Sequence, residues 1–137
     1  MAVHKVLPTL KGLIVRDGKI LLLRKKPTEH HKEGMYDLPG GHVCFGEDIA
    51  GCLQRTIKAD VNLLVEIKQP INAWTVVKDN RVELVGTTFL CGYRSGQVKL
   101  RPEYESYEWV PIKGLDKSKY PDWVKDNVHK IKTSKKK

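Results

Sequence analysis

Residue types suited to phosphate or metal chemistry gather around a double glycine in the first half of the chain. The stretch Gly34–Leu63 begins as an apolar strand, turns through Gly40 and Gly41, and enters a helix near Glu47. Glycine lets a backbone adopt conformations that other residues resist, and the N–H groups at a helix N-terminus attract anions. A strand, a glycine turn and a helix in this order are typical of a phosphate or metal site.

The segment before this stretch must supply a scaffold for it. Two apolar runs, residues 6–16 and 19–24, flank an Asp-Gly pair, which predicts a β-hairpin. The second run ends in three consecutive positive charges, Arg24, Lys25 and Lys26. Close to a glycine turn, such a basic strand end is a candidate phosphate clamp, and the alternative is a solvated strand end.

The helix after the glycines is expected to run from about Glu47 to Asp60. Ile49, Leu53 and Ile57 recur every four residues, which predicts one apolar face directed into the core. Acids at positions 47 and 48 in the first turn would complement the helix dipole.

The rest of the chain predicts further strands and a last helix. Residues 34–38 are expected to form a third strand, 63–68 and 71–78 two strands broken at Pro70, and 81–93 a half-buried strand. The last helix is expected to begin near Pro121 and to dock through its apolar positions, Val124, Val128 and Ile131. The order of elements indicates an α+β domain, a mixed sheet with helices packed on it.

Length and composition favour one soluble domain. The 137 residues, 40% of them hydrophobic, are enough for a single core, so we expect one domain spanning 1–137. No apolar run reaches the ~18–20 residues that cross a bilayer. The first five residues are too few and too polar for a signal peptide, so we expect a cytoplasmic protein without membrane contact. Three cysteines without C-x-x-C spacing argue against a disulfide framework or a zinc site.

Positive charge is concentrated at the C-terminal end. The net charge is +9, and the residues from Lys125 onward contain six lysines and one acid. We interpret the end of the chain, from about residue 132, as a solvated basic tail. The alternative is a weak, salt-sensitive contact with nucleic acid.

The central stretch resembles the Nudix box, in the spacing Gly41, five residues, Glu47, seven residues, Arg55. The segments 38–41 and 107–110 are also similar to that family. The resemblance implies the Nudix fold, a mixed β-sheet sandwiched between α-helices. It further implies hydrolysis of a nucleoside diphosphate linked to another moiety, with Mg²⁺ or Mn²⁺ as cofactor and a small-molecule nucleotide as substrate. Dimers are frequent in the family, so a homodimer is compatible with it.

The second half of the box departs from the family pattern. The family has glutamates where this chain has Thr56, Ala59 and Asp60, three positions that share one helix face. Three carboxylates there would hold hard cations through oxygen, but only Asp60 supplies one. We therefore expect a single metal ion that depends on ligands outside the helix.

The resemblance assigns roles to individual residues. It implies metal ligands at the Gly40 carbonyl, Asp60 and Glu103, with Glu103 acting either as a ligand or as a base. Glu47 and Arg55 are expected to form an orienting pair beside the metal, and with Glu103 they make up the expected catalytic group.

Contacts to substrate phosphates are expected from the basic strand end and the glycine turn. The residues expected to bind substrate are Arg24, Lys25, Gly40, Gly41 and His42. Two aromatic residues on strands, Trp74 and Tyr93, could stack on a base, although packing in the core is the favoured interpretation.

The residues and the family resemblance leave three possible functions open. The first is a single-metal, slow Nudix hydrolase. The second is a Nudix-fold module that has lost catalysis and binds a nucleotide or RNA. The third is an RNA-associated protein that works through its basic tail.

Overall fold

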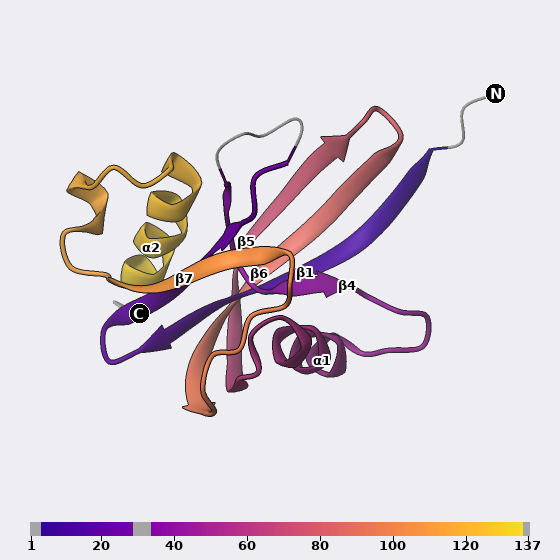
Figure 1. The fold of residues 1–137 in the computed structure, drawn as a ribbon. Helices are drawn as coiled ribbons and strands as arrows, with labels where there is room; N and C mark the ends of the chain where they lie inside the picture. The colour runs from indigo at the N-terminus through magenta and orange to yellow at the C-terminus, as the bar shows by residue number, and fades with distance from the viewer. Residues whose placement is uncertain (1–3, 29–33, 136–137) are drawn as a thin grey trace.

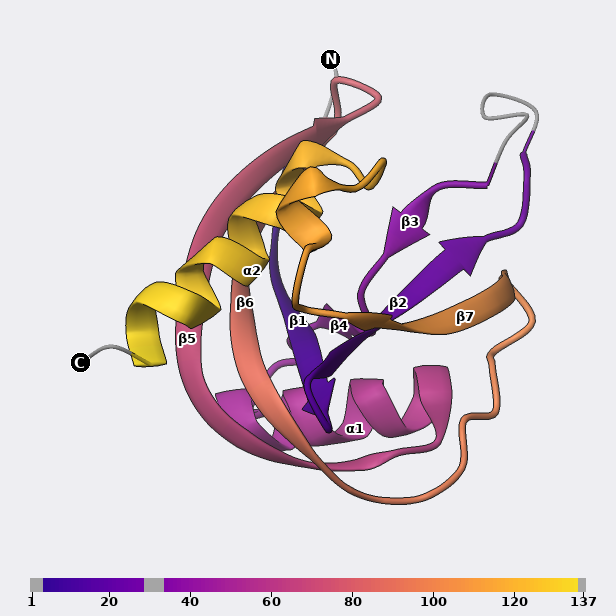
Figure 2. The same ribbon diagram turned by 90° about the vertical axis from the view of Figure 1, so that its left-hand side faces the viewer.

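The computed structural model describes residues 4–28 and 34–135, with side chains up to residue 131. One mixed sheet lies between two helices (Figures 1 and 2). Its strands are β1 (Lys5–Arg16), β2 (Lys19–Lys25), β3 (Tyr36–Asp37), β4 (Gly40–His42), β5 (Leu64–Lys78), β6 (Val82–Ser95) and β7 (Tyr104–Pro111). The helices are α1 (Ile49–Val61), the short 3-10 turn η1 (Leu115–Lys117) and α2 (Asp122–Lys135). The expected α+β architecture is confirmed.

Strand pairing places the first strand at the centre of the sheet. The order is β3-β2-β1-β6-β5, with β4 added to β1 and β7 added to β2. Strands β1 and β6 run parallel, and the other pairs are antiparallel. The β1–β2 hairpin turns at Asp17 and Gly18, whose φ angles are 49° and 75°. Positive φ at both central residues suits the twist of a hairpin, so the prediction from the Asp-Gly pair is confirmed.

Each face of the sheet has its own hydrophobic core. On one face, the apolar side of α1 packs over a cluster that includes Leu10 and Ile14 of β1. On the other face, α2 buries Val124, Val128 and Ile131 against a cluster that includes Leu13, Ile20 and Leu22, which confirms the expected docking face. Burial of one such side chain stabilises the fold by about 1.5–3 kcal/mol. Neighbouring residues of β1 therefore anchor opposite layers.

Helix α1 begins two residues later than the sequence indicates. Asp48 is its N-cap, and its Oδ1 accepts the N–H of Gly51 at 2.7 Å. Consequently the two acids precede the first turn instead of lying within it, and Asp48 complements the helix dipole as the N-cap. Ile49 is 53% exposed, so its expected core position is wrong. The buried face starts at Cys52, one turn into the helix.

Two strand predictions also need correction. The expected third strand is reduced to Tyr36–Asp37, and the expected glycine turn instead starts strand β4, in which Gly40 pairs with Lys11 of β1. Strand β5 continues through Pro70, with register shifts on either side of it. Because β5 ends the strand order, a proline and a bulge are tolerated there.

Residues 1–3, 29–33 and 136–137 lie outside the described part of the chain. Of the basic tail, only the backbone of 132–135 is described. Within the described residues, no helix combines the length and the apolar character needed to cross a membrane.

Candidate active site

The double glycine joins the edge of β1 to the end of α1. Gly40 lies in β4 with a φ of +149°, and its N–H donates a hydrogen bond to Asp60 Oδ2 at 3.0 Å. A side chain at this position would overlap the carbonyl oxygen of Leu10 on β1. Only glycine therefore allows β4 to approach β1 this closely while its N–H reaches the helix.

Asp60 is a buried acid. The residue is only 2% exposed, in the last turn of α1. Burial raises the pKa of its carboxyl group, whereas the Gly40 N–H and the positive charges of Lys11 and Arg101 act in the opposite direction. A carboxylate taken out of water needs such partners, and here they come from three different segments.

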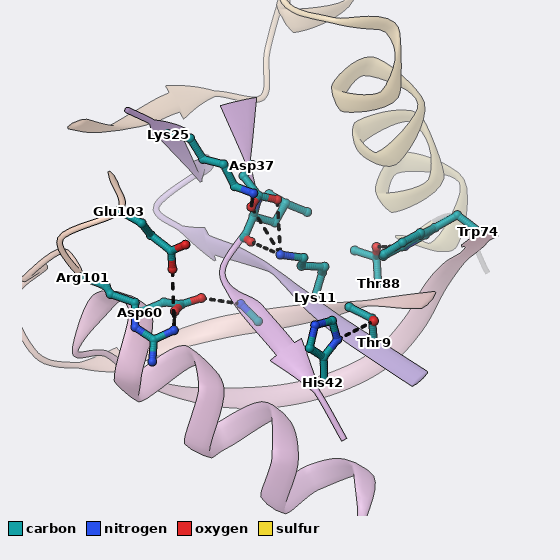
Figure 3. Close-up of polar contacts among 12 residues, drawn as sticks. Thr9, Lys11, Lys25, Asp37, His42, Asp60, Trp74, Thr88, Arg101 and Glu103 are labelled. Carbon is teal, nitrogen blue, oxygen red and sulfur yellow. Dashed lines mark hydrogen bonds and ion pairs between the residues drawn. The ribbon is translucent and has the colours of Figure 1, made fainter. Parts of the chain in front are cut away.

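Arg101 brings the two expected acidic ligands together. Its Nη1 lies 3.4 Å from Asp60 Oδ1 and 3.6 Å from Glu103 Oε1 (Figure 3). Its backbone N–H donates to the carbonyl oxygen of Asp60 at 3.0 Å, which fixes the loop before β7 against the end of α1. Arg101 is not among the site residues predicted from the sequence. Its position two residues before Glu103 was the available signal.

Glu47 and Arg55 form the expected pair. Arg55 Nε donates to Glu47 Oε2 at 2.7 Å, and Arg55 Nη2 donates to Glu47 Oε1 at 2.9 Å. Glu47 Oε1 also accepts the N–H of Cys44, and Arg55 Nη2 donates to the carbonyl oxygen of His42. These bonds hold the loop between β4 and α1, and the bond to Arg55 is the main reason why the pKa of Glu47 falls to about 2.

We expect the substitution Glu47→Gln to lower stability in a pH-dependent way. The folded-state pKa of Glu47 is depressed, so its stabilising effect is fully present above about 4.5 and is lost as the pH falls toward 2. Urea unfolding of both proteins should therefore differ at pH 7 and converge near pH 2. A difference that stays constant over this range would contradict the assigned charge of Glu47.

A second ionic cluster surrounds Asp37 at the end of β3. Lys11 Nζ lies 3.3 Å from Asp37 Oδ1 and donates to the carbonyl oxygen of Leu38 at 3.1 Å. Lys25 Nζ lies 3.5 Å from Asp37 Oδ2 (Figure 3). Lys25 was expected near the site, whereas Lys11 and Asp37 were missed. A lysine within an otherwise apolar strand was the signal for Lys11.

Arg24 contacts a different region. Its Nε donates to the carbonyl oxygen of Gly34 at 3.1 Å, and its guanidinium lies over the ring of Tyr36. Together with residues of β7 and Tyr120, it lines a pocket of about 310 Å³. Successive strand residues point to opposite faces, so Arg24 and Lys25 diverge. The structure does not bring Arg24 together with Gly40 and Asp60.

His42 and Gly41 complete the glycine segment. His42 pairs with Thr9 on β1, and its Nδ1 lies 3.0 Å from Thr9 Oγ1. Burial, and then the charges of Lys11 and Lys78, lower the pKa of His42, which favours a neutral ring. A side chain at Gly41 would press on Thr56.

Neither of the two substituted box positions supplies a carboxylate. The Thr56 hydroxyl is buried and donates to the carbonyl oxygen of Cys52 at 2.9 Å, within the helix. Ala59 is exposed and has no polar side-chain atoms. Among residues 4–28 and 34–131, no three His, Cys, Asp or Glu side chains are arranged to hold a metal ion together.

The two strand aromatics differ in their surroundings. Tyr93 packs against the α1-side core, under the guanidinium of Arg16, and its hydroxyl donates to the carbonyl oxygen of Gly96, which confirms the packing interpretation. Trp74 is half-buried, and its Nε1 donates to Thr88 Oγ1 at 3.0 Å (Figure 3). Thr88 pairs with Lys11 across β6 and β1, so Trp74 lies on a sheet face that continues toward the ionic cluster.

We expect Gly86→Ala to displace the Trp74 indole. The ring lies so close to Gly86 that an added methyl group would overlap it. Such overpacking costs about 1–3 kcal/mol, and the Trp74 indole N–H resonance should shift as its bond to Thr88 is lost. The matched control is Gly92→Ala on the same strand, where the methyl group meets only the flexible ends of the Lys68 and Glu66 side chains. An unchanged Trp74 resonance in Gly86→Ala would contradict this placement.

Comparison with known proteins shows the family to which the chain belongs. Residues 11–130 match the family model described as the NUDIX domain. The chain belongs to this family. Its box therefore lies in β4 and α1, with the glutamate–arginine pair in place and only Asp60 left of the three helix acids.

Two relatives of the Nudix chain illustrate the range of the family. An ADP-ribose pyrophosphatase of Methanocaldococcus jannaschii is 27% identical over 107 residues, which are 77% of this chain but only 62% of that protein. The nucleoside triphosphatase NudI of Escherichia coli is 30% identical over 117 residues, covering 75% of this chain and 80% of that protein.

A solved structure confirms the Nudix fold. The MutT protein from Methanosarcina mazei superposes with a TM-score of 0.80, and the match covers 98% of each chain at 22% identity.

Proposed function

We propose that this Nudix protein hydrolyses a nucleoside diphosphate linked to another moiety, with a single Mg²⁺ or Mn²⁺. The observation that carries the proposal is the buried Asp60 carboxylate, which is tied to the Gly40 N–H and shares one cation, Arg101, with Glu103. A carboxylate buried beside a glycine segment and a second acid is costly for the fold, so a functional role accounts for it better than a structural one.

The donor set fits one hard cation. Asp60 Oδ1 and Glu103 Oε1 face the same Arg101 nitrogen, so they converge on one position that accepts positive charge. We assign the metal to these two carboxylates and the Gly40 carbonyl, with waters and substrate phosphates completing its shell. When bound there, the cation would offset pyrophosphate charge and lower the pKa of a bound water.

The surrounding residues supply positioning and proton transfer. Glu47 and Arg55 hold the loop that follows β4, so the glycine segment stays in register. Lys25, Gly41 and His42, together with Lys11, are proposed to contact the substrate phosphates. We propose that Glu103, which is about half-exposed, accepts a proton from an attacking water.

The names of the two relatives support the substrate class. One is called an ADP-ribose pyrophosphatase and the other a nucleoside triphosphatase, and both names describe cleavage of phosphoanhydride bonds in nucleotides. This shared chemistry, rather than either substrate, is what we carry over to this chain.

The missing acids of helix α1 favour a second candidate function. Thr56 turns its hydroxyl into α1, and Ala59 contributes no ligand, so two of three box acids are missing. A Nudix-fold module that binds a nucleotide or RNA without cleaving it would tolerate these losses.

A hydrolysis screen separates the two functions. The purified chain would be incubated with Mg²⁺ and ADP-ribose, nucleotide sugars, dinucleoside polyphosphates or nucleoside triphosphates, and the products would be separated by chromatography. We expect Mg²⁺-dependent turnover of at least one class. Nucleotide binding without turnover above background would support the binding module and refute the enzyme.

A further inference from the structure

Arg101 and Arg55 are held in very different ways. Arg55 makes a close, two-point pair with Glu47 at 2.7 and 2.9 Å. Arg101 lies 3.4 and 3.6 Å from its two carboxylates, beyond the ~2.7–2.9 Å of a close charge-assisted bond. Its side chain is also 51% exposed. The contact of Arg101 is therefore loose, and its guanidinium is accessible to solvent.

The backbone of Arg101 is fixed more firmly than its side chain. Its N–H donates to the Asp60 carbonyl oxygen, and its own carbonyl oxygen accepts the N–H of Tyr104, both at 3.0 Å. Tyr104 is buried in the α1-side core. The guanidinium can therefore leave the carboxylates without any change in the loop that holds it.

Asp60 leaves one oxygen for an exchangeable partner. Its Oδ2 is taken by the Gly40 N–H, which is part of the strand framework, whereas its Oδ1 faces only the half-exposed Arg101 among its described partners. Because the carboxylate is 2% exposed, water alone solvates its charge poorly, so a cation is needed at Oδ1 whether or not a metal is bound.

We propose that Arg101 is a displaceable counter-cation, which occupies Asp60 and Glu103 until a divalent cation takes its place and then turns to the phosphates of the substrate. The second half of this statement rests on the proposed function, and the first half does not. Arg101 thereby contributes a positive charge in a site that has lost two of its three helix acids.

The guanidinium of Arg101 is suited to contact with the two carboxylates and with substrate phosphates. Its positive charge would repel a divalent cation strongly if both lay at the two carboxylates. Its planar set of N–H donors matches phosphate oxygens as well as carboxylates. Lys11 and Lys25 pair with Asp37 instead, so Arg101 is the cation of this region that contacts both Asp60 and Glu103.

Binding of Mn²⁺ to the protein alone tests the first half. Calorimetry or electron paramagnetic resonance would compare the unchanged protein with Arg101→Ala. Loss of the competing charge should tighten Mn²⁺ binding by roughly 1.5- to fivefold, the range of a loose ion pair. The matched control is Arg94→Ala, which removes an exposed arginine of β6 and should leave Mn²⁺ affinity unchanged. Equal or weaker Mn²⁺ binding by Arg101→Ala would overturn the competition.

Binding of α,β-methylene-ADP at saturating Mn²⁺ tests the second half. Arg101→Ala should bind this non-hydrolysable compound roughly three- to tenfold more weakly, and Arg101→Lys should recover part of the loss. Unchanged affinity in Arg101→Ala would overturn the phosphate contact. Neither measurement requires turnover, so tighter Mn²⁺ binding in a protein that fails the hydrolysis screen would retain the first half of the inference and reject the enzyme.

Discussion

Replacing Asp60 with asparagine is expected to lower kcat/KM by roughly 100- to 1000-fold, or about 3–4 kcal/mol of transition-state stabilisation. Asp60 is the single carboxylate that α1 directs to the Gly40 segment, and an amide carries no charge to hold a divalent cation. Turnover should be slower, and the increase in rate on adding Mg²⁺ should be smaller than in the unchanged protein. Initial rates measured across a Mg²⁺ titration would reveal both effects.

The same substitution should not weaken the fold at neutral pH. Burial raises the folded-state pKa of Asp60 above its usual value of 3.8. The stability linked to this group is therefore present below pH 3.8 and is lost as the pH rises through the raised pKa. A neutral amide in its place would avoid the cost of a buried charge, so the gain of the variant relative to the unchanged protein should be larger at pH 7 than at pH 3.

Urea unfolding at the two pH values provides the control for the kinetic result. A variant that is inactive but at least as stable at pH 7 would locate the defect in the site. Full Mg²⁺-dependent activity in Asp60→Asn would refute the proposed metal ligand. A large loss of stability at pH 7 would show that Asp60 serves the fold instead.

Gly40→Ala is expected to destabilise the protein by about 3–5 kcal/mol, a large share of the ~5–15 kcal/mol available to a domain. The added methyl group would overlap the carbonyl oxygen of Leu10, which belongs to the central strand and cannot turn away. A φ of +149° adds backbone strain for any residue with a side chain. The midpoint of urea denaturation would measure the effect.

Gly46→Ala is the matched control for this backbone effect. Gly46 also has a positive φ, +81°, but an added methyl group there would meet no atom within 4 Å. It should cost only the strain of the left-handed conformation, about 1–2 kcal/mol. Equal losses in the two variants would mean that strain, and not the contact between β4 and β1, makes glycine necessary at position 40.

Local patterns in the sequence predicted most of the framework. The Asp-Gly hairpin and the docking face of α2 depend on spacing within short segments, and the structure confirms both. The Glu47–Arg55 pair, which the resemblance to the Nudix box implied, is also present. Errors arose where a longer-range contact outweighed a local preference. Gly40 forms a strand because β1 offers an edge to pair with, and Ile49 stays exposed because the sheet lies under α1 only from Cys52 onward.

Charge pairing across the fold was decided by the tertiary structure alone. The sequence by itself determined the α+β class, the box spacing and the survival of one acid, Asp60, on the helix, because periodicity and spacing express these features directly. It could not show that Arg101 lies between Asp60 and Glu103, or that Lys11 and Lys25 share Asp37, because these partners come from separate strands and loops. Only folding brings these charges within a few ångströms of one another. At that distance, and partly shielded from water, their electrostatic interaction becomes strong.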